Sequence, residues 1–121
     1  MKFYTEHGEV EVAGEVFSTI AGYAAMGCFG VKGMAARGVA DGVAGLLRRE
    51  HIARGVKVTF FPEKGEIGLA LHIIVEHGVN IPAISRSIMD AVRYMLEKST
   101  GIRVGPMSIY VDGMMTGRGG A

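Results

Sequence analysis

The sequence has little of what several classes of protein require. Its 121 residues include a single cysteine, Cys28, which excludes an internal disulfide and a cysteine-based metal site and favours a reducing cytosol. The formal net charge is +1, so the overall charge does not support tight nucleic-acid binding, although a local basic patch is compatible with it. No apolar run approaches the roughly 18 residues of a membrane-spanning helix, and the first residues lack the apolar core of a signal peptide.

These absences favour one globular domain in the cytoplasm. Hydrophobic residues make up 49% of the chain, which is enough for a folded core without disulfides or structural metal ions. We expect residues 1–114 to form a single domain and the glycine-rich residues 115–121 to form a disordered tail.

Glycine, in contrast, is abundant, with 19 residues, and three glycines stand at equal spacing in the stretch MGCFGVKGMA, residues 26–35. The stretch lacks the hydroxyl residue of a Walker phosphate loop and the glycine spacing of a dinucleotide-binding fingerprint. We interpret it as the end of a helix at Gly27 and the turn beyond, with Val31 and Met34 packed inward and Lys32 at the tip. GVKG also resembles the GxxG loop of KH modules, which grip a nucleic-acid backbone.

The second half of the chain predicts a β-hairpin followed by a helix and a strand. Residues 55–61 and 66–78 alternate between apolar and mixed positions around the turn PEKG, which is typical of two antiparallel strands. The next residues predict a helix from Asn80, its N-cap, to Gly101, its left-handed stop. Period 2 returns over residues 102–112, where Gly105 and Pro106 should break or bulge the strand. The inward-facing residues of the second hairpin strand and of the helix are Ile67, Leu69, Leu71, Ile73, Val75, Ile84, Ile88, Val92 and Leu96.

The first half has weaker patterns. Residues 9–12 fit a short strand, and residues 15–27 fit a helix with Val16, Phe17, Ile20 and Ala24 inward. Residues 30–36 fit a short strand or an extended link, and residues 38–50 a glycine-loosened helix. The fold class that follows is an α+β two-layer sandwich, in the order β-α-(β)-(α)-β-β-α-β. Two main helices cover one face of a mostly antiparallel sheet.

The other face of this sheet is mixed and partly apolar, so we predict that it faces solvent or associates with a partner. The densest basic stretch, LLRREHIARGVK, can meet an anionic partner or can be a solvated helix end. The residues of a possible interaction surface are Phe61, His72, Ile74, Tyr110, Lys32, Arg48, Arg49 and Arg54.

No pattern predicts catalysis. The four histidines lack metal-ligand spacing, no pair of carboxylates stands out for acid–base chemistry, and Cys28 lacks the partners of a nucleophile. We therefore assign no catalytic, cofactor-binding or metal-ligating residue, and we interpret Cys28 as a small buried residue.

Three pieces of the sequence carry a family resemblance: Gly55 to Val58, His77 to Pro82, and Thr100 with Gly101. With their surroundings they resemble the bacterial alkaline shock proteins, general-stress proteins of Gram-positive bacteria, over about residues 8–114. The stretch VGPMSIYV departs from the family pattern, and His77 replaces a common tyrosine. The resemblance implies a cytosolic protein without catalytic residues or a cofactor, linked to cell-envelope stress and in some members recruited to the membrane by an anchor protein.

These observations lead to three functional hypotheses. The first is a non-catalytic envelope-stress protein that acts by self-association or through an envelope-associated protein, and nucleic acid is not its expected partner. The alternative is a nucleic-acid-binding module that uses GVKG and the basic residues Arg48, Arg49, Arg54 and Lys57. A small enzyme or thiol sensor at Cys28 is the third.

Overall fold

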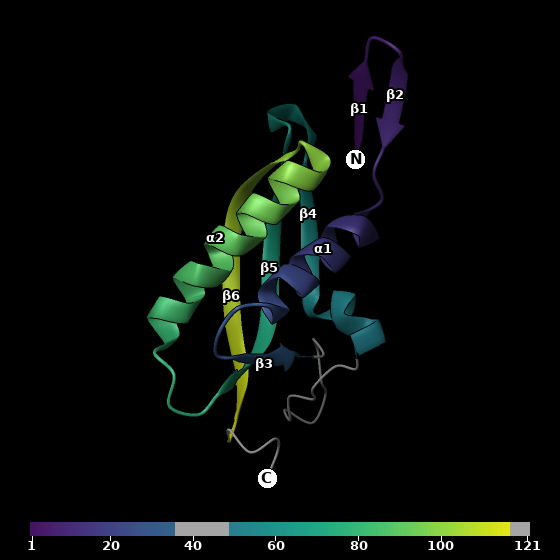
Figure 1. Cartoon of the computed structure of the whole chain (residues 1–121). Coiled ribbons are helices and arrows are strands. Elements are labelled where there is room, and N and C mark those ends of the chain that lie inside the picture. The colour runs from purple at the N-terminus through teal and green to yellow at the C-terminus, as the bar shows by residue number, and fades with distance from the viewer. Residues whose placement is uncertain (36–48, 117–121) are drawn as a thin grey trace.

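The chain folds into a sheet layer and a helix layer, described here from a computed structural model (Figure 1). The structure describes residues 1–35 and 49–116. The predicted helix over residues 38–50 therefore lies for the most part outside the described residues, as do the last five residues of the predicted tail.

Strand β5 (Glu66–Glu76) is the centre of the main sheet. Strand β4 (Val56–Phe61) and the short β3 (Val31–Met34) pair with it antiparallel, over residues 66–71 and 73–75 of β5 respectively. Strand β6 (Arg103–Met115) pairs with β5 in parallel. Because β6 pairs with β5 along nearly its whole length, β3 and β4 share the opposite edge.

Helix α2 (Ile81–Thr100) connects the two parallel strands. Its predicted start is confirmed, because the Asn80 side chain accepts a hydrogen bond of 3.0 Å from the Ala83 N–H. Its end is also confirmed, because Gly101 is left-handed and its N–H donates to the Glu97 carbonyl. The four residues predicted to face inward from this helix, Ile84, Ile88, Val92 and Leu96, are all buried.

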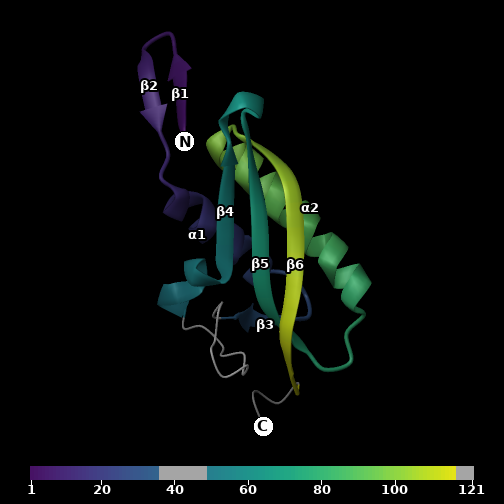
Figure 2. The same cartoon turned by 180° about the vertical axis from the view of Figure 1, so that it is seen from behind.

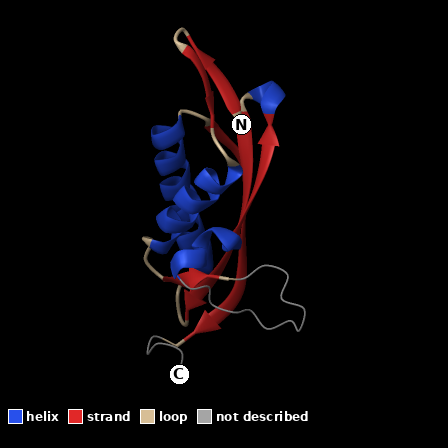
Figure 3. Cartoon of the chain, turned by 90° about the vertical axis from the view of Figure 1, so that its right-hand side faces the viewer, coloured by secondary structure: helices blue, strands red, loops and turns tan. Residues whose placement is uncertain are grey.

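Helix α1 (Gly14–Met26) lies beside α2 on the same face of the sheet (Figure 3). Its predicted inward stripe is only partly right. Phe17 is buried as expected, but Val16 is 44% exposed, and Ala21, Gly22 and Ala25 are buried in its place. Small residues on this stripe let the helix approach its neighbours closely, in particular the 3₁₀ segment η1 (Arg49–Gly55).

A β-hairpin that the sequence indicated only in part precedes α1. Strand β1 (Lys2–Thr5) pairs antiparallel with β2 (Gly8–Glu11), which is the strand predicted near residues 9–12. The hairpin, which we call the arm, projects beyond the two-layer body in Figures 1 and 2. Main-chain hydrogen bonds between Met1 and Val12 close its base.

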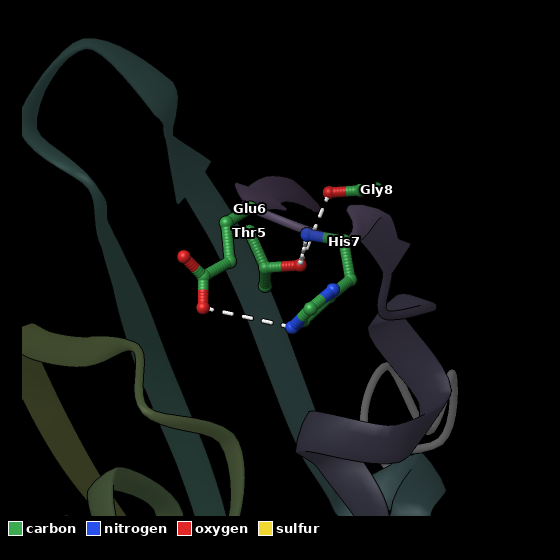
Figure 4. Close-up of polar contacts among 4 residues, drawn as sticks. All are labelled: Thr5, Glu6, His7 and Gly8. Carbon is green, nitrogen blue, oxygen red and sulfur yellow. Dashed lines mark hydrogen bonds and ion pairs between the residues drawn. The ribbon is translucent and has the colours of Figure 1, made fainter.

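The tip of the arm is held by local polar contacts (Figure 4). The Thr5 hydroxyl accepts a 3.1 Å hydrogen bond from the His7 N–H and donates one of 3.3 Å to the Gly8 carbonyl. The Glu6 and His7 side chains lie 3.5 Å apart but are almost fully exposed, so their attraction contributes little. Such contacts shape the turn without anchoring the arm to the body.

Candidate interaction surface

The face of the sheet away from the helices is open, and Figure 2 shows its strands unobstructed by α1 and α2. A shallow groove of about 450 Å³ runs over β4, β5 and β6 on this face. Its floor is the middle strand, where Gly68 and Ala70 carry almost no side chain. Phe61 and Thr59 stand on the β4 side, and Tyr110 on the β6 side. The groove therefore follows from small residues between larger ones.

His72 and Tyr110 form the aromatic end of the groove. Their rings stack with centroids 4.7 Å apart and an interplanar angle of 12°. The His72 Nδ1 atom lies 2.7 Å from the Asp112 Oδ2 atom, so a hydrogen bond joins ring and carboxylate. With Nδ1 held by Asp112, the Nε2 atom is the ring nitrogen left for a further contact.

A bulge in β6 accompanies this contact. His72 pairs with Tyr110 and Ile73 with Val111, but Ile74 pairs with Gly113, so Asp112 is an extra residue in the ladder. An earlier bulge follows from the same register, because Ile67 pairs with Val104 and Leu69 with Met107. This earlier bulge lies at Gly105 and Pro106, where the sequence predicted an irregularity.

Sequence reasoning missed the contact between His72 and Asp112. The alternation of β6 placed Asp112 on the same face as Tyr110, and that was the available signal. The partner could not be identified from it, because neither the parallel pairing of β5 with β6 nor the register follows from alternation alone.

The predicted interaction residues are only partly brought together. Phe61, His72 and Tyr110 share the open face, as expected. Ile74 was predicted to join them but is 3% exposed, so this prediction is wrong: its side chain is buried and cannot meet a partner.

The basic residues do not join this face as a group. Arg48 lies outside the described residues, and Arg49 begins η1. Arg54 is exposed near the end of η1. Lys57, also exposed, is the member of the basic stretch that lines the groove.

The glycine stretch was correctly interpreted as a helix end, but its tip was misplaced. Gly27 caps α1, and the turn runs to Gly30, whose φ of +88° favours glycine. The Gly30 carbonyl accepts a hydrogen bond from the Glu76 N–H, so β3 starts directly afterwards. Lys32 therefore lies within β3, and Phe29, 83% exposed, lies in the turn.

This placement removes the geometry of a KH loop. A GxxG grip needs a loop that presents its backbone to a phosphate chain. Here all of GVKG after Gly30 is strand, with Gly33 paired to Ile74 of β5. Val31 is half-buried and Met34 fully buried, as the sequence predicted.

Cys28 is half-buried at the junction of the two helices. Its Sγ atom lies 3.5 Å from the Ala24 carbonyl oxygen of α1 and 3.9 Å from the Ser87 carbonyl oxygen of α2. Burial raises the pKa of the Cys28 thiol above its ordinary value, because the thiolate is less well solvated there. A nucleophilic cysteine requires the opposite shift.

Within residues 1–35 and 49–116, no three His, Cys, Asp or Glu side chains gather to hold a metal ion. Neither of the two described α-helices combines the length and the apolarity needed to cross a bilayer. What the geometry offers is a two-layer α+β domain with an open, hollowed sheet face.

Comparison with known proteins places this chain in a family. Residues 2–116 match the model of the ASP23 family, which is described as having a cell envelope-related function. The chain belongs to this family, in agreement with the resemblance found in the sequence.

Three relatives cover most of the chain. The uncharacterized protein YloU of Bacillus subtilis is 33% identical over 111 residues, which is 91% of each chain. The uncharacterized protein Spy1614 of Streptococcus pyogenes is 30% identical over 115 residues, 93% of this chain and 92% of the relative. The uncharacterized protein YqhY of Bacillus subtilis is 31% identical over 110 residues, 91% of this chain and 79% of the relative. No solved structure matches the chain with significance.

Proposed function

We propose that this protein acts in cell-envelope stress or homeostasis without catalysis, by associating with a second copy of itself through the open sheet face. The groove on that face carries the proposal, because it is exposed, contiguous and partly apolar. Solvated sheet faces are usually dominated by polar side chains, whereas this one sets Phe61, Tyr110 and a small-residue floor among polar residues such as Lys57 and Ser108. The family's envelope-related function supports the cellular role.

A second copy is the partner that the charges of the face fit. Lys57 lies on β4 at one side of the face, and Asp112 lies on β6 at the other. A two-fold axis along the strands would set β4 of one copy over β6 of the other, and the same patch is then used twice. Lys57 is level with Ala70 and Ser108, and Asp112 lies about three residues further along, next to Ile73, so the opposite charges would lie on facing edges of the interface without direct contact.

The resemblance to alkaline shock proteins supports the cellular location. It implies a cytoplasmic protein that a partner can hold at the membrane. We propose that location for this chain, with the assembled form being the one that an envelope protein captures. Pull-down from cytosolic and membrane fractions with wild-type and association-deficient protein tests this step, since only the wild type should be retained with the membrane fraction.

Light scattering over a concentration series tests the association itself. The Tyr110→Ser and Ala70→Arg variants should be monomers at concentrations at which the wild type is a dimer. Tyr110→Ser removes an aromatic wall of the groove, and Ala70→Arg fills its floor. Tyr94→Ser is the matched control, since Tyr94 is 61% exposed on α2, away from this face. A wild-type protein that stays monomeric at high concentration, or a Tyr94→Ser variant that dissociates equally, contradicts the proposal.

A further inference from the structure

A second cavity lies between the arm and the body, by the end of β4. Its volume is about 530 Å³, which is within the roughly 300–1,000 Å³ of small-molecule sites. The arm contributes Met1 and Phe3 to its wall, and the body contributes Phe60, Pro62 and Ile102. The cavity is therefore mostly apolar and is closed on one side by a segment with few anchors.

The polar groups of this cavity favour a negatively charged ligand. Among the described residues that line it, Lys2 has the only charged side chain, and no carboxylate in the described ranges forms an ion pair with it. The terminal ammonium of Met1 is positive as well and donates to the Val12 carbonyl. The Thr100 hydroxyl also lines the cavity but is already used, because it donates to the Leu96 carbonyl and accepts from the Ile102 N–H. A free ammonium beside apolar walls suits an anionic amphiphile.

We propose that this cavity binds the acyl chain of a free long-chain fatty acid. The chain lies against Phe3, Phe60 and Ile102, and the carboxylate pairs with the Lys2 ammonium. A ligand held there touches both arm and body and so stabilises their contact. This matters for the arm, because a two-stranded hairpin alone is marginally stable in water.

Titration with cis-parinaric acid, a fluorescent long-chain fatty acid, tests the site directly. Its emission should rise and saturate with the wild type. Phe3→Ser should weaken binding about tenfold by removing part of the apolar wall. Tyr4→Ser is the matched control, because Tyr4 is the next residue of the arm, is 75% exposed and does not line the cavity.

The charge is tested with Lys2→Glu against Lys64→Glu, a nearby exposed lysine outside the lining. Lys2→Glu should weaken parinaric acid binding about threefold to tenfold and leave its uncharged methyl ester unaffected. Lys64→Glu should change neither. Circular dichroism melting of each variant verifies that it is folded.

These experiments distinguish a free fatty acid from a membrane surface that carries anionic lipids. Binding of wild type to anionic phospholipid vesicles without binding of free parinaric acid overturns the proposal in favour of a membrane surface. Absent saturation, or equal losses in Phe3→Ser and Tyr4→Ser, overturns it as well. Tyr110→Ser should bind normally, so failure of this site and failure of the proposed self-association remain distinguishable.

Discussion

The two faces of β5 are built from alternating residues of one strand, yet they have different roles. On the covered face, five large aliphatic side chains from Ile67 to Val75 are at most 5% exposed. On the open face, Gly68 and Ala70 leave a groove, and His72 reaches across to Asp112. A strand can thus stabilise the fold with every second residue and leave Ala70 and His72 between them accessible for contact.

Among the substitutions that test the difference between the two faces, Leu71→Ala should lower the free energy of unfolding the most. Leu71 is fully buried against the helix layer, and its truncation removes apolar contacts and leaves a cavity. We expect the free energy of unfolding to fall by about 2–5 kcal/mol, measured by urea denaturation. The adjacent Ala70→Ser, on the open face, should stay within about 0.5 kcal/mol. Similar losses in both variants would mean that the two faces are not energetically distinct.

Gly22→Ala should show how tightly the helix layer is packed on the covered side. A Cβ atom at this position would lie 2.3 Å from Cγ2 of Ile52, which is itself buried in η1. Overpacking should destabilise the protein by about 1–3 kcal/mol, although helix propensity alone favours alanine by about 1 kcal/mol.

Gly14→Ala serves as the control for this clash. There the nearest contact would be 3.5 Å, to the Phe60 ring, which is ordinary van der Waals distance. A Gly22→Ala variant that melts at a higher temperature than the wild type would show that Ile52 can move aside and that the layer is looser than described.

The difference between the covered and the open face also explains how much of the fold and of the candidate site could be predicted from the sequence. The buried residues on the covered face of β5 and on α2 followed directly from periods of 2 and about 4, because both elements have one strongly apolar side. Helix α1 is apolar on most sides, so its periodicity did not distinguish Val16 from Ala21. The contact between His72 and Asp112 depends on parallel pairing and a bulge, which arise from tertiary packing rather than local pattern.

The arm and the cavity beneath it were beyond prediction for a different reason. Strand β1 has four residues and only one of them is even half-buried, so no clear apolar side marks it in the sequence. The cavity depends on where the arm rests relative to Phe60 and Ile102, which are distant from it in sequence.

Asn80→Ala should have an intermediate effect, because it removes the cap that starts α2. The Ala83 N–H would lose its side-chain acceptor, and the free energy of unfolding should fall by about 1 kcal/mol. Ser99→Ala, near the other end of the same helix, is the control. Thermal melting followed by circular dichroism measures both. Equal stability of the two variants would show that the covered side holds α2 in place without its cap.

Cys28 should give the smallest effect, visible only in alkali. Because burial raises the pKa of its thiol, the folded protein retains the proton at pH values where the unfolded chain has lost it. The resulting stability is complete below the ordinary thiol pKa of about 8.5 and is lost as the pH rises through the folded value. Urea denaturation at neutral and alkaline pH should therefore show a smaller alkaline loss in Cys28→Ala than in the wild type. Labelling of the native thiol by a disulfide reagent should also be slower than that of free cysteine at the same pH. If the stability of the wild type and of Cys28→Ala changed equally with pH, and if the thiol were labelled rapidly, the helix junction would not shield Cys28. The covered side would then be open at this point.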